Sequence, residues 1–176
     1  MKQTNTKKLA VAAVFCAVAV AGSLFSFPVF GSKCSPVQHM VNILCAVLLG
    51  PGYGLGAAFA AALIRNLLGL GSLMAFPGSM IGALCCGLAY MAFRKLWLTC
   101  IAEASGTGIL GGLAAYPVAK LMMGLNPGGL FVYIVPFLVS TVVGSILAYF
   151  LVTALQKGGV ISMYRHPAKK EMKMSQ

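Results

Sequence analysis

The chain has 176 residues, of which 60% are hydrophobic and 9% charged, and its mean hydropathy is +0.92. A soluble domain carries roughly 25% charged residues, so this composition excludes a soluble globular protein and predicts an integral membrane protein. The net charge is +11. In a membrane protein this excess indicates basic cytoplasmic segments and contact with anionic membrane lipid, and we expect no nucleic acid partner.

The hydropathy pattern predicts an all-α protein with six transmembrane helices and short connections. A basic tail at residues 1–8 precedes a transmembrane domain at residues 9–156, and a second basic tail follows at residues 157–176. Glycine and proline clusters separate most of the helices. We expect the helices at residues 9–27, 36–49, 53–70, 79–98, 103–123 and 130–155.

Positive charge predicts the orientation of these helices. With six spans, both termini lie on one side of the membrane, and that side carries ten of the 13 lysines and arginines. The other side keeps Lys33, Arg65 and Lys120. By the positive-inside rule, both termini are expected in the cytoplasm.

Acidic residues are restricted to Glu103 and Glu171, and there is no aspartate. Carboxylate clusters for Mg²⁺ and a Gly-x-x-x-x-Gly-Lys-Ser/Thr phosphate loop are absent, so the chain has no visible means of hydrolysing ATP. Because Glu103 is expected to begin the fifth helix, we expect no carboxylate in the middle of a span. The six cysteines form no CxxC pair, and the histidines have no cysteine at zinc-ligand spacing, so neither a metal site nor a cofactor is predicted.

Polar side chains converge on the outer side of this arrangement. On the second helix, Gln38 and Asn42 are four residues apart, and His39 and Asn42 are three apart, so they share a face. The inner half has few polar groups, which predicts an outward-facing pocket rather than a channel. The candidate binding residues are Cys34, Gln38, His39, Asn42, Arg65, Asn66, Phe76, Ser79, Tyr116, Lys120 and Tyr133.

Each candidate also has a structural interpretation. Arg65 and Lys120 can reach lipid headgroups with their long side chains, and the aromatic candidates can be interfacial anchors. Cys34 and His39 are close in sequence, which leaves a membrane enzyme as an alternative. No orienting acid accompanies that pair, so we expect no catalytic residues.

Small residues recur on the first helix. Ala13, Ala17 and Ala21 are spaced four residues apart and therefore form a stripe on one face. Such stripes let the backbone of another helix approach closely.

Two motifs carry a family resemblance: KCSPVQHMVNILCAVLLGPGY at residues 33–53 and ALIRNLLGLGSLMAFPGSMIGAL at residues 62–84. They resemble the ThiW family, the substrate-binding S components of energy-coupling factor (ECF) vitamin transporters. The resemblance implies a six-helix bundle in the bacterial cell membrane that works with a transmembrane coupling protein and two cytoplasmic ATPases.

The resemblance also implies a ligand and two surfaces. The ligand is the thiazole moiety of thiamine, hydroxyethylthiazole, held under a lid that contains Lys33, Cys34 and Pro36. The alanine stripe of the first helix is the implied docking face for the coupling protein. Another vitamin or an anionic metabolite remains an alternative ligand, because Arg65 and Lys120 are hard to explain with a neutral molecule.

Overall fold

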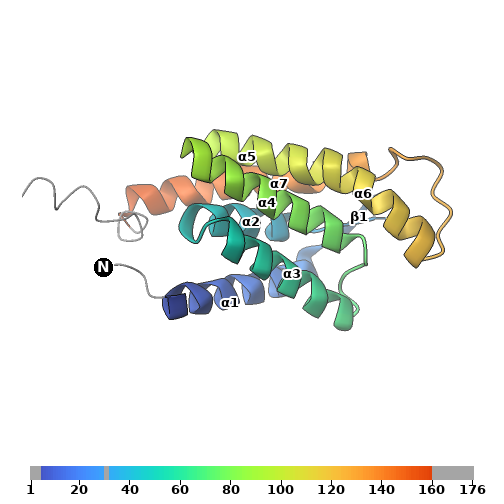
Figure 1. Cartoon of the computed structure of the whole chain (residues 1–176), viewed down its shortest axis with the longest axis horizontal. Coiled ribbons are helices and arrows are strands. Elements are labelled where there is room, and N and C mark those ends of the chain that lie inside the picture. Colours follow the sequence, from blue (N-terminus) through green and yellow to red (C-terminus); the bar gives the residue numbers. More distant parts are fainter. Residues whose placement is uncertain (1–4, 30–31, 160–176) are drawn as a thin grey trace, which may run out of the picture.

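A computed structural model of the chain describes residues 5–29 and 32–159. Its helices form a bundle of six rods, and one short hairpin caps the bundle at one end (Figure 1). The fifth rod is one long run of helix in four pieces. The six rods are α1 (Asn5–Gly22), α2 (Pro36–Leu48), α3 (Pro51–Leu67), α4 (Ala75–Phe93), the run of α5 (Leu96–Ser105), η2 (Gly106–Gly111), α6 (Gly112–Pro117) and η3 (Val118–Met122), and α7 (Ile134–Lys157).

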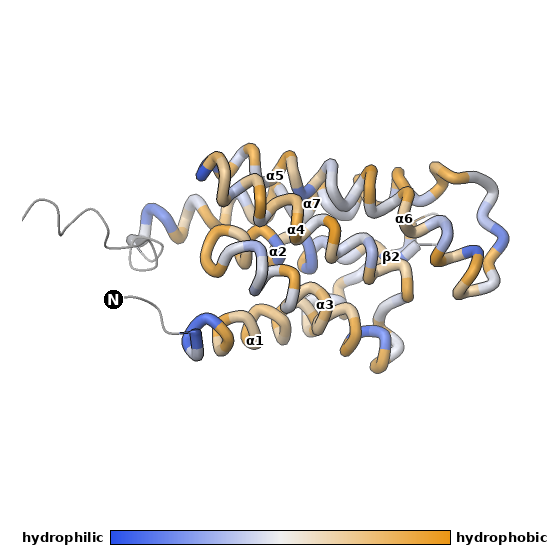
Figure 2. The backbone as a smooth tube through the Cα atoms, viewed as in Figure 1, coloured by the Kyte–Doolittle hydropathy of each residue, from blue (hydrophilic) through white to orange (hydrophobic). Residues whose placement is uncertain are grey.

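Four of these rods are long and apolar enough to cross a membrane: α1 with the following 3₁₀ turn η1 (Ser23–Phe25), α4, the α5–η3 run and α7. Helix α2 has 13 residues and is about 20 Å long, against a hydrocarbon thickness of about 30 Å. Hydrophilic residues gather mainly at the two ends of the bundle (Figure 2). The chain is thus a multi-pass membrane protein.

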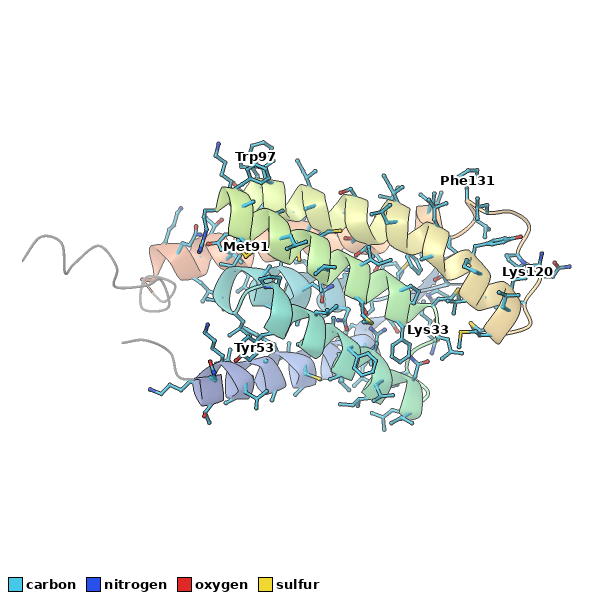
Figure 3. The ribbon with its side chains drawn as sticks, in the orientation of Figure 1. Lys33, Tyr53, Met91, Trp97, Lys120 and Phe131 are labelled. Atoms are coloured by element: carbon cyan, nitrogen blue, oxygen red, sulfur yellow. The ribbon has the colours of Figure 1, made fainter. Side chains whose placement is uncertain are left out.

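The start of α1 and the end of α7 lie at the same end of the bundle (Figure 1). The opposite end carries the hairpin, the α3–α4 loop and the loop before α7. Lys33 and Lys120 lie toward that opposite end, whereas Tyr53 and Trp97 lie toward the end where α1 begins (Figure 3).

The turn between α4 and α5 differs from the sequence expectation. Residues 79–98 were expected to form one helix, but α4 ends at Phe93, and Arg94 adopts a left-handed conformation with φ 54°. The next helix begins at Leu96 rather than at Glu103. No glycine or proline marks this turn. The turn consists of two cationic residues, Arg94 and Lys95, whose charged side chains can reach the membrane surface from a helix end.

Segment 27–36, expected as a loop, contains an antiparallel pair of short strands. β1 (Phe27–Val29) pairs with β2 (Ser32–Cys34), and Pro28 lies opposite Lys33 in the ladder. Pro36 then occupies the first turn of α2, where its missing N–H has no partner to lose.

Helix α2 is the centre of the bundle and contacts α1, α3, α4, α5 and α7. Glycines allow several of these close approaches. A Cβ on Gly144 of α7 would lie 2.8 Å from His39 Cβ, and a Cβ on Gly82 of α4 would lie 2.8 Å from both carboxylate oxygens of Glu103 and overlap Thr107 Oγ1. Replacing either glycine therefore requires the neighbouring atoms to shift.

Gly82→Ala tests this packing. The added methyl group has no room beside Glu103 and Thr107, and overpacking of this kind costs roughly 1–3 kcal/mol. We expect a lower thermal unfolding temperature in detergent micelles. Gly56→Ala is the matched control, because Gly56 is exposed within α3 and a Cβ added there would have no atom within 4 Å. That change should stabilise the helix by about 0.5–1 kcal/mol. Equal unfolding temperatures for the two variants would contradict the packing described.

Candidate functional site

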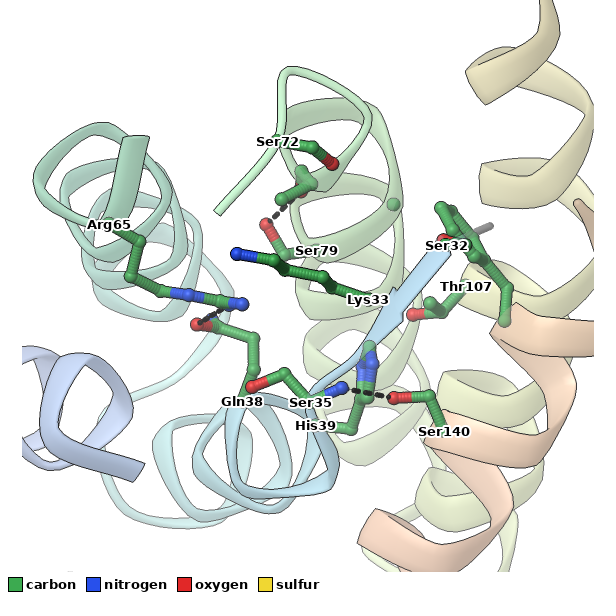
Figure 4. Close-up of a pocket in the computed structure, with 13 residues that line it drawn as sticks. Ser32, Lys33, Ser35, Gln38, His39, Arg65, Ser72, Ser79, Thr107 and Ser140 are labelled. Atoms are coloured by element: carbon green, nitrogen blue, oxygen red, sulfur yellow. Dashed lines mark hydrogen bonds between the residues drawn. The ribbon is translucent and has the colours of Figure 1, made fainter. Parts of the chain in front are cut away.

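A cavity lies beneath the hairpin (Figure 4), at the end of the bundle opposite the start of α1 and the end of α7 (Figure 1). Its volume is about 40 Å³. Ligand pockets usually exceed about 300 Å³, so this cavity holds only a few water molecules in the conformation seen here. Its lining residues are Ser32, Lys33, Ser35, Gln38, His39, Arg65, Ser72, Ala75, Gly78, Ser79, Thr107, Phe137 and Ser140.

Hydrogen bonds from three consecutive residues hold the hairpin over the cavity. Lys33 Nζ donates to the Gly69 carbonyl at 3.3 Å, Cys34 Sγ donates to the Pro136 carbonyl at 3.1 Å, and the Ser35 N–H donates to Ser140 Oγ at 2.9 Å. The hairpin is therefore tied both to the α3–α4 loop and to α7.

The thiol of Cys34 is the donor in its contact with the Pro136 carbonyl. Burial raises the pKa of Cys34, so the thiol stays protonated at neutral pH. A protonated thiol can donate to the Pro136 carbonyl, and it is a poor nucleophile.

Below the cavity, one carboxylate oxygen collects three donors. Glu103 Oε1 accepts from His39 Nδ1 at 3.0 Å, from Asn42 Nδ2 at 3.1 Å and from Thr107 Oγ1 at 3.0 Å. The Glu103 side chain is 0% exposed. Since His39 donates through Nδ1, its Nε2 is left as an acceptor when the ring is neutral.

A chain of amides extends this network to a buried cation. Arg65 Nη1 donates to Gln38 Oε1 at 3.3 Å, and Gln38 Nε2 donates to Asn42 Oδ1 at 3.3 Å. Asn42 Nδ2 also donates to the Ser79 carbonyl at 3.1 Å, which fixes the orientation of the Asn42 amide. In this chain of hydrogen bonds, each donor points from Arg65 toward Glu103. Together with the contact to Ser79, the bonds link α2 to α3, α4 and α5.

Of the predicted binding residues, the structure places Gln38, His39, Arg65 and Ser79 on the cavity wall. Cys34 and Asn42 are buried and do not line the cavity: Asn42 donates to the carbonyl of the lining residue Ser79, and Cys34 lies between the lining residues Lys33 and Ser35 in the sequence. The face that the sequence assigned to the start of the second helix is thus part of one site.

Asn66 and Phe76 do not line the cavity. The Asn66 amide donates to the carbonyls of Ala62 at 2.8 Å and Ser72 at 3.1 Å, so it holds the end of α3 against the following loop. The ring of Phe76 packs against Phe59 with centroids 5.8 Å apart.

Tyr116, Lys120 and Tyr133 also lie outside the cavity lining. The two tyrosines pack in a hydrophobic cluster with Met74, and Lys120 is exposed with Nζ 6.0 Å from the Tyr116 ring centroid. The aromatic side chain that lines the cavity is Phe137, one helical turn beyond Tyr133.

Sequence reasoning missed Glu103, Thr107, Phe137 and Ser140. The expectation that no carboxylate lies within a span is wrong. Glu103 lies seven residues after Leu96, about 10 Å into a run of helix that ends at Met122. The signal was present: Glu103 is one of only two acids in the chain, and it falls inside apolar sequence.

The arrangement is suited to binding a polar molecule. Within residues 5–29 and 32–159, no group of three histidine, cysteine or acidic side chains could hold a metal ion. Cys34 and His39 do not pair with each other, because the thiol contacts Pro136 and the imidazole contacts Glu103. The cavity instead presents hydroxyl, amide, imidazole and cationic groups beside one aromatic ring.

Replacing Glu103 tests the network beneath the cavity. Glu103→Leu leaves three buried donors without an acceptor, at a cost of about 1–3 kcal/mol each, so we expect a large loss of thermal stability. Glu103→Gln keeps one acceptor oxygen and should lose less. Ser105→Ala, on the exposed side of the same helix, serves as the control. A Glu103→Leu variant as stable as the wild type would show that the carboxylate does not organise these helices.

The family comparison agrees with this geometry. The profile of a family described as thiamine-precursor transporter protein (ThiW) matches residues 9–158, which include every helix around the cavity. No curated protein matches the sequence significantly. The match confirms the resemblance indicated by the two motifs at residues 33–53 and 62–84. The chain therefore belongs to the ThiW family of thiamine-precursor transporter proteins.

Proposed function

We propose that the chain is the substrate-capture (S) subunit of an ECF-type importer in the bacterial cell membrane, and that it binds the thiazole moiety of thiamine. The observation that carries this proposal is the polar cavity closed by the hairpin in a protein of a thiamine-precursor transporter family. We assign no catalytic role, because the family is one of transporter proteins.

The cavity wall suits a small flat heterocycle. A thiazole ring is largely apolar and stacks on or packs edge-on against an aromatic side chain, a role for Phe137. A hydroxyethyl group donates to an imidazole acceptor, a role for His39 Nε2, which the Glu103 contact leaves free of a proton in the neutral ring. Serine and threonine hydroxyls around the wall can donate to the ring nitrogen.

The cavity has to open for such a ligand to enter. Its volume of about 40 Å³ is too small for a substituted ring. The hairpin is held by hydrogen bonds from Lys33, Cys34 and Ser35, and those of Lys33 are exposed to solvent. We propose that the hairpin moves away to admit the ligand and closes over it.

The distribution of basic residues indicates how the chain is oriented in the membrane, and its sequence motifs bear on how uptake is powered. With both termini in the cytoplasm, the cavity faces the outside, as the distribution of lysine and arginine favours. The chain lacks a nucleotide-binding motif, so uptake driven by ATP hydrolysis needs partner ATPases and a protein that couples them to this chain.

The alanine stripe on α1 is the proposed docking face for the coupling protein. Ala13, Ala17 and Ala21 are all exposed, while Ala12 and Cys16 on the opposite side pack into the bundle. Helix α1 therefore presents a smooth surface of small side chains outward, where a second helix can approach closely.

Ligand titration of the purified full chain in nanodiscs tests the proposed cargo. A ligand at 100 times its dissociation constant stabilises the folded state by about 2.7 kcal/mol, which raises the unfolding temperature by several degrees. We expect thiazole compounds derived from the thiamine thiazole to produce this rise, and the pyrimidine moiety of thiamine to produce none. An equal response to both moieties, or no response to any thiazole, would refute the thiazole assignment.

Ala17→Leu tests the docking face. The larger side chain should block close helix approach and abolish co-purification of the coupling protein with its ATPases. Ligand-induced stabilisation should stay unchanged, because Ala17 lies outside the cavity lining. Ala92→Leu, at an exposed position on α4, is the matched control. Undiminished complex formation by Ala17→Leu would place the partner elsewhere.

A further inference from the structure

Arg65 is a buried charge without an acidic partner in the part of the chain that the structure describes. It is 3% exposed, and the one hydrogen bond of its guanidinium is the 3.3 Å contact to Gln38. Its Nε is buried and has no partner. The one acid in these residues, Glu103, is engaged by His39, Asn42 and Thr107, two amide side chains away from the guanidinium.

An unpaired buried charge is strongly unfavourable, because a neutral amide restores only part of the hydration that the guanidinium loses. Snorkelling to lipid headgroups, the alternative that the sequence left open, does not apply to a side chain this buried. Arg65 instead lines the cavity, where a ligand can supply the missing negative charge.

Two further donors line the same cavity. Lys33 Nζ contacts only the carbonyls of Gly69 at 3.3 Å and Leu70 at 3.5 Å, and Ser35 Oγ is buried with no partner at all. Figure 4 shows Arg65 reaching in from α3, while Lys33 and Ser35 come from the hairpin and the residue that follows it. Beside the acceptor Nε2 of His39, this wall therefore presents the unpartnered Nε of Arg65, the unpartnered hydroxyl of Ser35 and the exposed ammonium group of Lys33.

Lys120, the other cation that the sequence linked to an anionic ligand, is exposed beside Tyr116 and takes no part in this wall. The site is therefore built from Arg65, Lys33 and Ser35. A guanidinium fork matches the two oxygens of a carboxylate or phosphate, and charge-assisted bonds of this kind are stronger than neutral ones.

We propose that the cavity binds an anionic ligand whose acidic group, a carboxylate or a phosphate monoester, contacts Arg65 together with Lys33 and Ser35. This inference rests on the proposed function, under which the cargo is a thiazole that carries an acidic group rather than the neutral alcohol. Because Lys33 belongs to the hairpin, its contact with the anion also ties the closed hairpin to the ligand.

Three thiazoles that share one ring test this proposal on the full chain in nanodiscs: hydroxyethylthiazole, its phosphate monoester and (4-methylthiazol-5-yl)acetic acid. We expect the two anions to bind about tenfold or more tightly than the alcohol. The two acidic compounds separate phosphate from carboxylate recognition. Inorganic phosphate alone, measured by thermal shift, reports the anion site without the ring.

Arg65→Gln supplies the second measurement. It should weaken the binding of both anions about tenfold or more and the binding of the alcohol much less, and it should raise the unfolding temperature of the ligand-free protein, since an unpaired buried charge is gone. Lys120→Gln removes a cation outside the cavity and should change neither property.

The outcomes separate the two proposals. If the alcohol binds as tightly as both anions, or if Arg65→Gln weakens all three compounds equally, the anion site is refuted and the thiazole function stands. If no thiazole binds, the proposed cargo is refuted. The anion site is then supported only if inorganic phosphate stabilises the wild type and not Arg65→Gln, and it is refuted otherwise. Should Arg65→Gln fail to fold, the comparison of compounds on the wild type decides.

Discussion

The buried carboxylate of Glu103 is the group on which the inside of this bundle depends. A charge within a membrane-spanning run is tolerated only when donors surround it, and three side chains from α2 and η2 converge on Oε1. Their convergence fixes the rotation of α2 relative to the α5–η3 run. Gly82 of α4 contributes by having no side chain, since any Cβ there would meet the same carboxylate. At Glu103, the polar contacts with α2 and η2 therefore coincide with the close approach of the α4 backbone at Gly82.

This network also sets the chemical character of the cavity above it. Glu103 orients His39 so that the ring presents an acceptor when neutral, while the amides of Gln38 and Asn42 lead from Arg65 toward the carboxylate. The cavity wall thus has two different ends, an imidazole and a guanidinium. Under the proposed function, the imidazole accepts a hydrogen bond from the hydroxyl group of the cargo. Under the further proposal, the guanidinium binds an acidic group.

Closure of the site depends on weaker contacts than those beneath it. The hairpin is held by hydrogen bonds from Lys33, Cys34 and Ser35, of which the two lysine contacts are exposed to solvent. The floor, by contrast, is fixed by helix packing and by fully buried polar groups. A rigid floor under a lightly tethered cover is the arrangement expected of a binding protein that must open to load. It also explains why the volume is small in this conformation.

The sequence by itself determined the membrane class, the helical bundle and the polar face of Gln38, His39 and Asn42, because hydropathy and helical spacing are local properties. The two motifs at residues 33–53 and 62–84 indicated the family. Only the tertiary structure decided the rest. The α4–α5 turn lacks glycine and proline, so the sequence predicted that Glu103 begins a helix. The structure places Glu103 inside the apolar α5–η3 run instead. Tyr133 and Phe137 differ by one helical turn, and the depth of α7 in the bundle decides which ring meets the cavity. Arg65 and Lys120 look alike in sequence, yet one is buried without an acid beside it and the other faces outward.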